Sequence, residues 1–272
     1  MTNSIFSLSN KIIVFTGATG VLGSSICHYL AAQGAQLILV GRTKEKVELL
    51  QSEIIDSGGK VKGYTVDVTN EKELERLAAQ IKSLFGHIDI LINGAGGNMA
   101  GAVITPDQTF LDLDSSSLKK IIDLNYMGTV LPIKALLPLM LEKNAGNIIN
   151  FSSMAASRPM TRVMGYASAK AAIDNLTKFL SVELAKKHGP NFRVNALAPG
   201  FFLTEQNRSL LTQEDGNLTD RGNQIIAHTP MDRFGKPKDL HGALHWLCSE
   251  ASEFVTGTVL AVDGGFSAYS GV

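Results

Sequence analysis

The sequence has no excess of charge of either sign, because its 25 Lys and Arg residues are balanced by 25 Asp and Glu residues. It has only two cysteines, Cys27 and Cys248, and each lies in an apolar helical pattern. Without a basic patch, we expect neither a nucleic-acid partner nor an anionic membrane partner. Two isolated cysteines form neither a disulfide framework nor a zinc site, and they favour a reducing compartment.

Long hydrophobic runs are also missing. The longest apolar stretch, 127–141, is interrupted by two prolines and a lysine, so we expect no membrane-spanning helix. The first ten residues lack the basic flank and the apolar core of a signal peptide. His241 and His245 are four residues apart, but Gly242 stands where a zinc protease needs Glu, so we expect no metal site. These absences predict a soluble, cytoplasmic protein.

Short apolar runs alternate with helical patterns along all 272 residues, of which 44% are apolar. Continuous apolar strands separated by helices are typical of a parallel sheet that is covered on both faces. We therefore predict an α/β fold: a Rossmann-type doubly wound parallel sheet of about seven strands in a single domain, 1–272. The expected strands are 11–15, 35–40, 61–66, 88–92, 147–151, 192–197 and 258–262. The expected helices are 21–33, 43–57, 70–85, 115–143, 165–188 and 237–248.

Two long segments, 97–114 and 199–236, interrupt this alternation. Loops of this length are usually functional unless they are disordered. Both follow the carboxyl ends of strands, where ligands bind in open α/β sheets. They could be tolerated surface insertions, but we favour a wall of the substrate pocket for the first. For the second we favour a substrate lid at about 201–236.

A glycine-rich turn stands between the first expected strand and the first expected helix. Gly17, Gly20 and Gly23 would allow a tight turn and a close approach of the backbone to a pyrophosphate at the helix N-terminus. Structural glycines without a ligand are the alternative. The strand-turn-helix context favours a dinucleotide site.

Tyr166 and Lys170 are four residues apart in an expected helix, so their side chains share one face. A nearby ammonium favours the phenolate and should lower the tyrosine pKa from its ordinary value of about 10. Such a phenol suits proton exchange with an alcohol or ketone oxygen. Ser153, at the end of the strand 147–151, could hold the same oxygen. Taken alone, the pair is better explained as an accidental feature of a surface helix, and other motifs of the chain are needed to favour the catalytic interpretation.

Further motifs follow along the chain: Asp67-Val68, Asn93-Gly94-Ala95-Gly96, Asn125, Ser153, Tyr166-x-x-x-Lys170 and Pro199-Gly200. With the glycine turn, these motifs make the chain resemble the short-chain dehydrogenase/reductase family over essentially its full length. One departure is visible, because the common single-domain pattern has glycine where Val21 stands. The spacing found here is more usual in the extended branch of the family.

The resemblance implies a catalytic tetrad of Asn125, Ser153, Tyr166 and Lys170. Tyr166 would be the general acid in reduction and the base in oxidation, and Lys170 would lower its pKa and hold the nicotinamide ribose. Ser153 would position the carbonyl oxygen, and Asn125 would hold a water of the proton relay. Hydride would pass directly between nicotinamide and substrate, so no metal is required.

The resemblance also implies a nicotinamide cofactor. An acidic residue after the second strand would bind a ribose 2′-hydroxyl, whereas Arg accommodates a 2′-phosphate. Arg42 stands there, so we predict NADP(H), with NAD(H) as the other possibility and a solvated helix-start role as the alternative for Arg42. The expected cofactor-binding residues are Gly17, Thr19, Gly20, Val21, Leu22, Gly23, Arg42, Asp67, Val68, Asn93, Gly94, Ala95, Tyr166, Lys170, Pro199, Gly200 and Thr204.

Three stretches, 96–98, 199–208 and 263–272, resemble the D-mannonate oxidoreductase (fructuronate reductase) subgroup. This implies the reversible reduction of D-fructuronate to D-mannonate. A sugar acid needs a cation for its carboxylate and several polar partners for its hydroxyls. Each arginine among the candidates could instead be a surface or inter-subunit residue. The candidate substrate residues are Asn98, Arg158, Arg162, Gln206, Asn207 and Arg208.

Several alternatives remain open. One is another sugar-acid or polyol reductase, such as a gluconate 5-dehydrogenase. A 3-oxoacyl carrier-protein reductase is disfavoured because the sequence has no basic patch for an acidic carrier. A non-catalytic dinucleotide sensor would normally have lost Tyr166 or Lys170.

The family usually forms tetramers through its two long helices, here 115–143 and 165–188, so a homotetramer that acts on a small sugar acid is expected.

Overall fold

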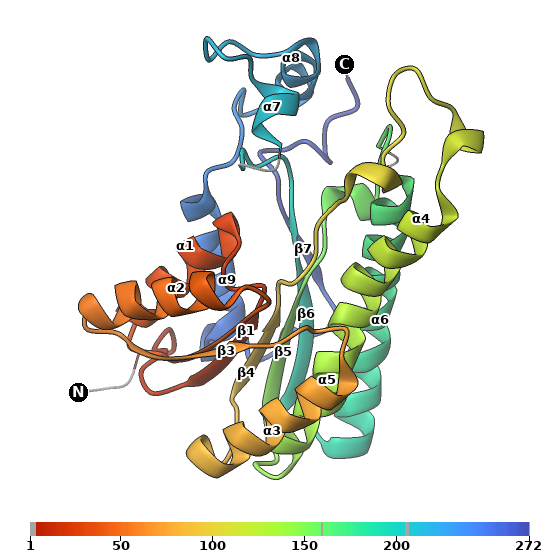
Figure 1. The fold of residues 1–272 in the computed structure, drawn as a ribbon. Coiled ribbons are helices and arrows are strands. Elements are labelled where there is room, and N and C mark those ends of the chain that lie inside the picture. Colours follow the sequence, from red (N-terminus) through yellow and green to blue (C-terminus); the bar gives the residue numbers. More distant parts are fainter. Residues whose placement is uncertain (1–3, 159, 205–206, 272) are drawn as a thin grey trace.

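A computed structural model describes residues 4–158, 160–204 and 207–271. Its seven strands form one parallel sheet in the order β3-β2-β1-β4-β5-β6-β7 (Figure 1). The predicted doubly wound α/β fold is therefore confirmed, and each expected strand is present within about two residues of its predicted bounds. The strands are β1 (Ile12–Thr16), β2 (Gln36–Gly41), β3 (Lys60–Thr65), β4 (Ile90–Asn93), β5 (Gly146–Phe151), β6 (Phe192–Pro199) and β7 (Val259–Val262).

Helices cover both faces of the sheet, because successive strand side chains point in opposite directions. In β1, Ile13 and Phe15 belong to the apolar cluster that includes α1, α2 and α9. Val14 belongs to the opposite cluster, which includes α3 and α5. On the first face lie α1 (Val21–Ala32), α2 (Lys44–Asp56) and α9 (His241–Cys248). On the second lie α3 (Glu71–Phe85), α5 (Gly128–Leu141) and α6 (Met164–His188).

The helix predicted over 115–143 is not a regular α-helix. It consists of α4 (Ser115–Ile122), a π-helical turn η3 (Asp123–Met127) and α5, which contains two prolines. By length and composition alone, Ser115–Leu141 could cross a membrane. In this fold, however, half of its most apolar window is buried, and α5 packs on α3 and on the central strands. It is a core helix of the α/β fold.

The two long segments lie beyond the carboxyl ends of the strands (Figure 1). The segment 97–114 carries only two single-turn helices, η1 (Ala100–Ala102) and η2 (Phe110–Asp112). The second long segment, the expected lid and called the lid segment below, carries α7 (Arg208–Leu211) and α8 (Asp220–Ala227) and returns to its starting point, where the Gly235 amide donates to the Phe201 carbonyl at 2.8 Å. The remaining short helices are η4 (Met154–Ala156), η5 (Pro237–Leu240) and η6 (Glu250–Ser252).

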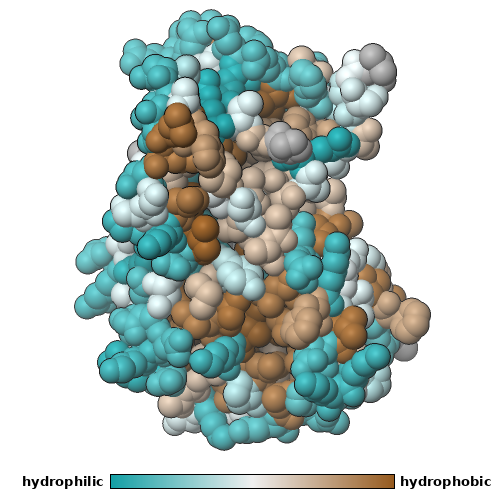
Figure 2. Space-filling model, turned by 90° about the vertical axis from the view of Figure 1, so that its right-hand side faces the viewer, coloured by the Kyte–Doolittle hydropathy of each residue, from teal (hydrophilic) through white to brown (hydrophobic). Residues whose placement is uncertain are grey.

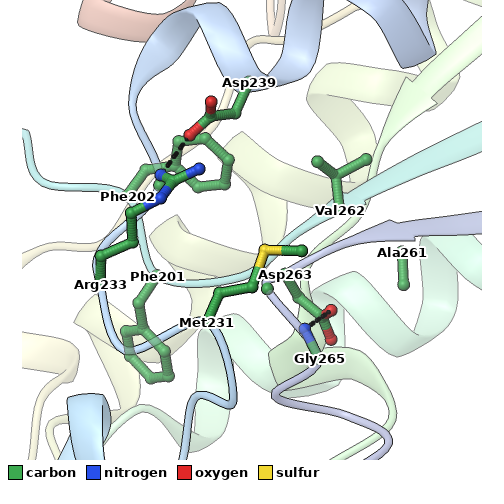
Figure 3. A pocket seen from close by; sticks show the side chains of 11 residues that line it. Phe201, Phe202, Met231, Arg233, Asp239, Ala261, Val262, Asp263 and Gly265 are labelled. Atoms are coloured by element: carbon green, nitrogen blue, oxygen red, sulfur yellow. Dashed lines mark hydrogen bonds and ion pairs between the residues drawn. The ribbon is translucent and has the colours of Figure 1, made fainter.

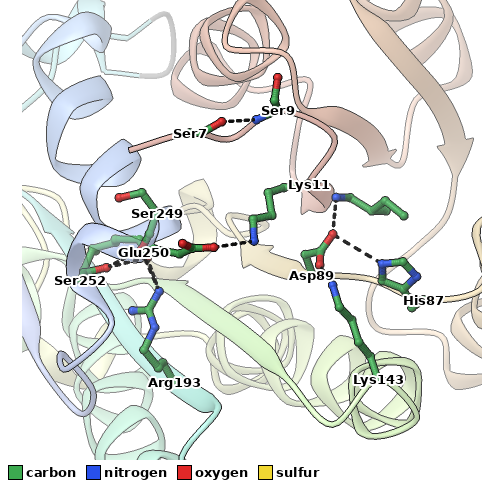
Figure 4. A network of polar contacts seen from close by, with 12 residues as sticks. Ser7, Ser9, Lys11, His87, Asp89, Lys143, Arg193, Ser249, Glu250 and Ser252 are labelled. Atoms are coloured by element: carbon green, nitrogen blue, oxygen red, sulfur yellow. Dashed lines mark hydrogen bonds and ion pairs between the residues drawn. The ribbon is translucent and has the colours of Figure 1, made fainter. Parts of the chain in front are cut away.

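A polar network ties together the opposite end of the sheet, where the strands begin (Figure 4). Asp89 accepts a hydrogen bond from the Ile12 amide at 2.7 Å and pairs with Lys143 and, at 3.7 Å, with His87. Arg193 donates to three backbone carbonyls around the end of α9. These groups join the starts of β1, β4 and β6 to the end of α9, around a hollow of about 290 Å³.

Candidate active site

The glycine turn between β1 and α1 is held against the end of β4. Gly17 has a φ of 72°, and a Cβ there would lie 2.6 Å from the Gly94 carbonyl oxygen, so only glycine fits. A Cβ at Gly23 would lie 2.5 Å from the Gly17 carbonyl oxygen, which lets the helix start close to the strand. At Gly20 the corresponding space is nearly open. The turn therefore leaves room for a ligand directly in front of the helix.

The N-terminus of α1 offers backbone donors without competing side chains. Its N-cap is Gly20, which supplies no side-chain hydrogen bond, and the first turn contains no acidic residue. The first N–H groups of a helix have no intrahelical partners, and the helix dipole favours an anion beside them. A diphosphate fits this position.

A groove of about 410 Å³ runs from this turn past the end of β2 to the start of the lid. The groove is lined by most of the predicted cofactor residues and also by Lys46 and Leu124, which the sequence did not single out. Asp67 lines an adjacent hollow that shares Arg42 with the groove. The predicted residues that line the groove are Gly17, Thr19, Gly20, Val21, Leu22, Gly23, Arg42, Val68, Gly94, Ala95 and Thr204.

The other predicted cofactor residues lie around the groove rather than along its lining. Asn93 is buried, and its side-chain amide donates to the Asn150 side chain at 2.9 Å. Pro199 ends β6, and a Cβ at Gly200 would lie 2.7 Å from Asp263. These residues shape the end of the sheet on which the groove is built.

Tyr166 and Lys170 lie side by side in the first turns of α6, as their spacing predicts. The Lys170 Nζ is 5.6 Å from the centre of the Tyr166 ring and donates to the Phe151 carbonyl at 2.6 Å. The hydroxyl of Ser153, just after β5, is close enough to the Tyr166 phenol to favour its charged form and lower its pKa. Two hydroxyls and an ammonium therefore converge at the carboxyl end of β5.

Asn125 lies in the π-helical turn and holds the start of the first long segment. Its side-chain nitrogen donates to the carbonyls of Gly97 (2.8 Å) and Ile121 (2.9 Å), and its side-chain oxygen accepts from the Gly97 amide (3.0 Å). A Cβ at Gly96 would lie 2.6 Å from this oxygen and 3.4 Å from the Lys170 Nζ. The structure thus places Asn125 and Lys170 beside Gly96, with Tyr166 next to Lys170 and Ser153 next to Tyr166.

Burial controls the protonation of the site. It raises the pKa of the Tyr166 phenol, and the Ser153 hydroxyl offsets only part of this rise. Burial also lowers the pKa of Lys170 to about 8, against the opposing effect of Asp174 one turn further along α6. The prediction that Lys170 lowers the pKa of Tyr166 is therefore wrong for the net shift, because desolvation of the phenol dominates.

Two of the candidate substrate residues form hydrogen bonds that connect loops. Arg158 is exposed, and its guanidinium donates to the Ser267 carbonyl. Asn207 is engaged within the lid, where it bonds to the Thr204 amide and the Phe202 carbonyl, both at 2.8 Å. Both side chains hold loops in place.

The remaining candidates are less constrained. Asn98 is exposed and accepts only from the amide of the next residue. Arg208 is exposed on α7, whereas Arg162 is half-buried just before α6. Gln206 lies outside the described residues. Sequence reasoning missed Arg221 on α8, whose guanidinium reaches Thr161 at 3.2 Å.

A second hollow, of about 420 Å³, lies at the base of the lid beside β7 (Figure 3). Apolar side chains, including Phe201 and Met231, form one wall. The Arg233–Asp239 ion pair, with 2.6 Å between nitrogen and oxygen, lies on another. This pair holds the returning end of the lid segment and was not anticipated from the sequence.

Among the described residues, no group of three or more His, Cys, Asp or Glu side chains is placed to hold a metal ion. His241 and His245 have other partners. His241 contacts the Ser25 hydroxyl at 3.0 Å, and His245 contacts the Tyr29 hydroxyl at 2.8 Å. The two histidines join α9 to α1.

Comparison with known proteins gives this site its context. Residues 17–267 match the sequence model of a family described as enoyl-(acyl carrier protein) reductase. A crystal structure of a provisionally assigned D-mannonate oxidoreductase from Haemophilus influenzae, with bound NAD, superposes with a TM-score of 0.91 at 43% identity, covering 99% of this chain and 100% of that one. The chain belongs to the short-chain dehydrogenase/reductase family. It is therefore an NAD(P)-dependent oxidoreductase.

Two more distant members of the family share the fold over nearly the whole chain. The 5-keto-D-gluconate 5-reductase of Escherichia coli K12 is 33% identical, covering 97% of this chain and 98% of its own. A provisionally assigned NAD(P)-dependent gluconate 5-dehydrogenase from Beutenbergia cavernae, with bound NADP, is 30% identical with a TM-score of 0.85, covering 98% of this chain and 100% of that one. Relatives in this family thus hold either nicotinamide.

Proposed function

We propose that this short-chain dehydrogenase/reductase interconverts a keto sugar acid and its alcohol, with D-fructuronate and D-mannonate as the pair. The observation that carries the chemistry is the convergence of Ser153, Tyr166 and Lys170 beside the dinucleotide groove. The substrate proposal is supported by the 43% identity to the Haemophilus protein. It is also supported by two arginines near the carboxyl ends of the strands, Arg162 just before α6 and Arg208 on α7.

The glycine cradle and the open N-terminus of α1 fit a nicotinamide dinucleotide, which supplies or accepts the hydride when bound. In reduction, Ser153 and Tyr166 would both hydrogen-bond to the ketone oxygen. Tyr166, which burial keeps protonated, would then donate its proton to the developing alkoxide. Lys170, held by the Phe151 carbonyl, would stabilise the phenolate that remains. Asn125 would keep Gly97 in place. Its side-chain oxygen would also accept a hydrogen bond from a water of the proton relay.

A panel of substrates tests the proposal. Initial rates would be compared for D-fructuronate, 5-keto-D-gluconate, D-fructose and a 3-oxoacyl thioester. We expect the highest kcat/KM with D-fructuronate. A preference for 5-keto-D-gluconate would favour the alternative that the 33% identity to the Escherichia coli enzyme supports. A preference for the thioester, or no turnover of any substrate, would refute the sugar-acid proposal.

For the cofactor, we propose a preference for NADP(H). Arg42 follows β2, is exposed and lines the groove together with Lys46, and the adjoining residues Gly41 and Thr43 carry no acid. Two cations at this position favour a 2′-phosphate. Comparing the kcat/KM values for NADPH and NADH measures the preference, and replacing Arg42 with Ala should lower the value for NADPH more than that for NADH. A higher value for NADH in the wild type would contradict the proposal.

We further propose a cytoplasmic homotetramer assembled through the long helices. The right-hand side of the molecule in Figure 1, which faces the viewer in Figure 2, carries a broad patch of apolar side chains. On α6, Phe179 is 60% exposed and Val182 is 55% exposed, which is unfavourable in water. Light scattering of the purified protein should give about four times the 29.1 kDa chain mass. A monomer that persists at micromolar concentration would refute this assembly.

A further inference from the structure

Three segments far apart in the sequence meet at Thr161 and Arg162, just before the helix α6 that carries Tyr166. Arg162 lies four residues before Tyr166, in the segment that joins η4 to α6. Arg221, in the first turn of α8 in the lid, donates from its guanidinium to the Thr161 hydroxyl at 3.2 Å. The Ile104 amide, from the first long segment, donates to the Arg162 carbonyl at 3.0 Å. The first long segment, the segment before α6 and the lid segment therefore meet around Arg162 and Arg221.

The contact between Arg221 and Thr161 brings Arg221 near Arg162, the next residue in the sequence. Both residues are half-buried, and among the described residues no carboxylate lies within ion-pairing distance of either. Burial and the charge of Arg162 both lower the pKa of Arg221. Like charges that are near each other without a counter-ion are unfavourable, and an anion that pairs with both removes this cost.

The backbone around Arg162 is also unusual. Its φ is 76°, in the left-handed region that side chains of this size rarely adopt. Sparsely populated backbone conformations persist where surrounding contacts impose them, and they are frequent at ligand-binding positions. Here the hydrogen bond from the Ile104 amide fixes the Arg162 carbonyl. A tertiary contact therefore helps to impose the left-handed backbone at Arg162.

We propose that Arg162 and Arg221 together bind the carboxylate of the substrate. This inference rests on the proposed sugar-acid function and assigns the charge recognition of that same site. Each guanidinium presents a planar set of donors that matches a carboxylate. Arg162 lies four residues before Tyr166 and next to Thr161, the hydrogen-bond partner of Arg221, so a carboxylate held by both arginines would lie beside the segment that carries the catalytic phenol. Arg221 in the lid segment would thereby favour sugar acids, because a neutral ketose has no carboxylate to pair with it.

A binding measurement tests this assignment independently of turnover. D-Mannonate is added to the complex of enzyme and NADPH, which cannot react, and its Kd is followed through the cofactor fluorescence. In Arg221→Gln and in Arg162→Gln, the Kd for D-mannonate should rise about 10- to 100-fold, the effect of losing a hydrogen bond to a charged group. The ratio of kcat/KM for D-fructuronate to that for D-fructose should fall by a similar factor.

Matched variants separate charge recognition from folding. Lys186→Gln removes one positive charge at the other end of α6 and should leave the Kd for D-mannonate unchanged. Arg221→Lys keeps the charge without the planar fork and should give an intermediate Kd. Equal losses for D-fructuronate and D-fructose in Arg221→Gln would indicate a structural role for Arg221 and overturn the proposal.

The outcomes distinguish this inference from the proposed function. If the wild type reduces keto sugar acids but both Gln variants bind D-mannonate normally, the arginine assignment is wrong and the function stands. If D-mannonate binds through the arginines but D-fructuronate is not reduced, the assignment stands and the function fails. If the wild type binds no sugar acid, both are wrong. A ketose phosphate that binds more tightly than D-mannonate, with the same loss in the variants, would assign the pair to a phosphate and overturn the carboxylate proposal.

Discussion

At the scale of single residues, burial acts on Tyr166 and Lys170 in opposite directions. Removing water disfavours the charged form of each, so the phenol keeps its proton while the ammonium tends to lose one. The sequence indicated the adjacency of the two side chains correctly, because four residues complete about one helical turn. It could not indicate the net pKa shift, which depends on how tightly β5, α6 and the turn at Gly96 enclose the pair.

The pKa of Lys170 leads to a pH prediction. Below pH about 8 the side chain is an ammonium that stabilises the phenolate formed in reduction, and above this pH it is increasingly neutral. The kcat for keto-acid reduction should therefore fall as the pH rises through about 8. Steady-state rates between pH 6 and pH 10 measure this, with Lys170→Met as the comparison. A profile that is flat in the wild type, or identical in Lys170→Met, would remove Lys170 from the proton-transfer step.

Gly17 gives a second prediction at this scale. Replacing Gly17 with Ala places a Cβ in the left-handed backbone region and against the Gly94 carbonyl. Gly58 has a similar φ of 83° but no atom within 4 Å of an added Cβ, so Gly58→Ala is the matched control. We expect Gly58→Ala to lower the free energy of unfolding by about 1 kcal/mol and Gly17→Ala to lower it further. Only Gly17→Ala should also weaken dinucleotide binding, as calorimetry would show. An equal loss of dinucleotide affinity in Gly58→Ala would refute the role of the glycine turn in binding.

At the scale of elements, the order of strands and helices was predictable because each has its own apolar period. The π-helical turn at Asp123–Met127 was not, because its cause is a tertiary contact: Asn125 bonds to Gly97, 28 residues earlier. The contact between Arg221 in the lid and Thr161 was hidden for the same reason, because 60 residues separate them. Local sequence patterns do not report such pairs.

The π-helical turn yields a prediction for the first long segment. Asn125→Ala leaves the Gly97 amide and carbonyl without their side-chain partner, which should reduce the free energy of unfolding by about 1–3 kcal/mol. Amide hydrogen exchange at 97–104 should accelerate, while exchange in β2 stays unchanged. Unaltered protection at Gly97 would show that the Asn125 side chain does not hold this segment.

At the scale of the whole molecule, the two ends of the sheet have separate tasks. The ends where the strands begin carry the polar network around Asp89, and the carboxyl ends carry the glycine turn, the tetrad and the lid segment (Figures 1 and 4). We therefore expect that stability and activity can be changed independently. Asp89 is only 9% exposed at its side chain and has three partners, so it is the most informative position in the network.

Replacing Asp89 with Ala should reduce the free energy of unfolding by about 1–3 kcal/mol, because the Ile12 amide and Lys143 both lose their acceptor. Asp89→Asn keeps an oxygen for the Ile12 amide and should lose less. Denaturant unfolding measures both values. The KM values for cofactor and substrate should stay as in the wild type. A change in KM comparable to that from a substitution at the carboxyl ends would contradict the separation of the two ends.

The most direct test of the central claim is the rate of NADPH oxidation by D-fructuronate with the wild type and with Tyr166→Phe. The variant keeps the ring and loses only the hydroxyl, so cofactor binding should be retained while kcat falls by about 10²- to 10⁴-fold, the usual contribution of a general acid. A wild type that reduces D-fructuronate no faster than D-fructose, or a Tyr166→Phe variant that retains its rate, would contradict the account.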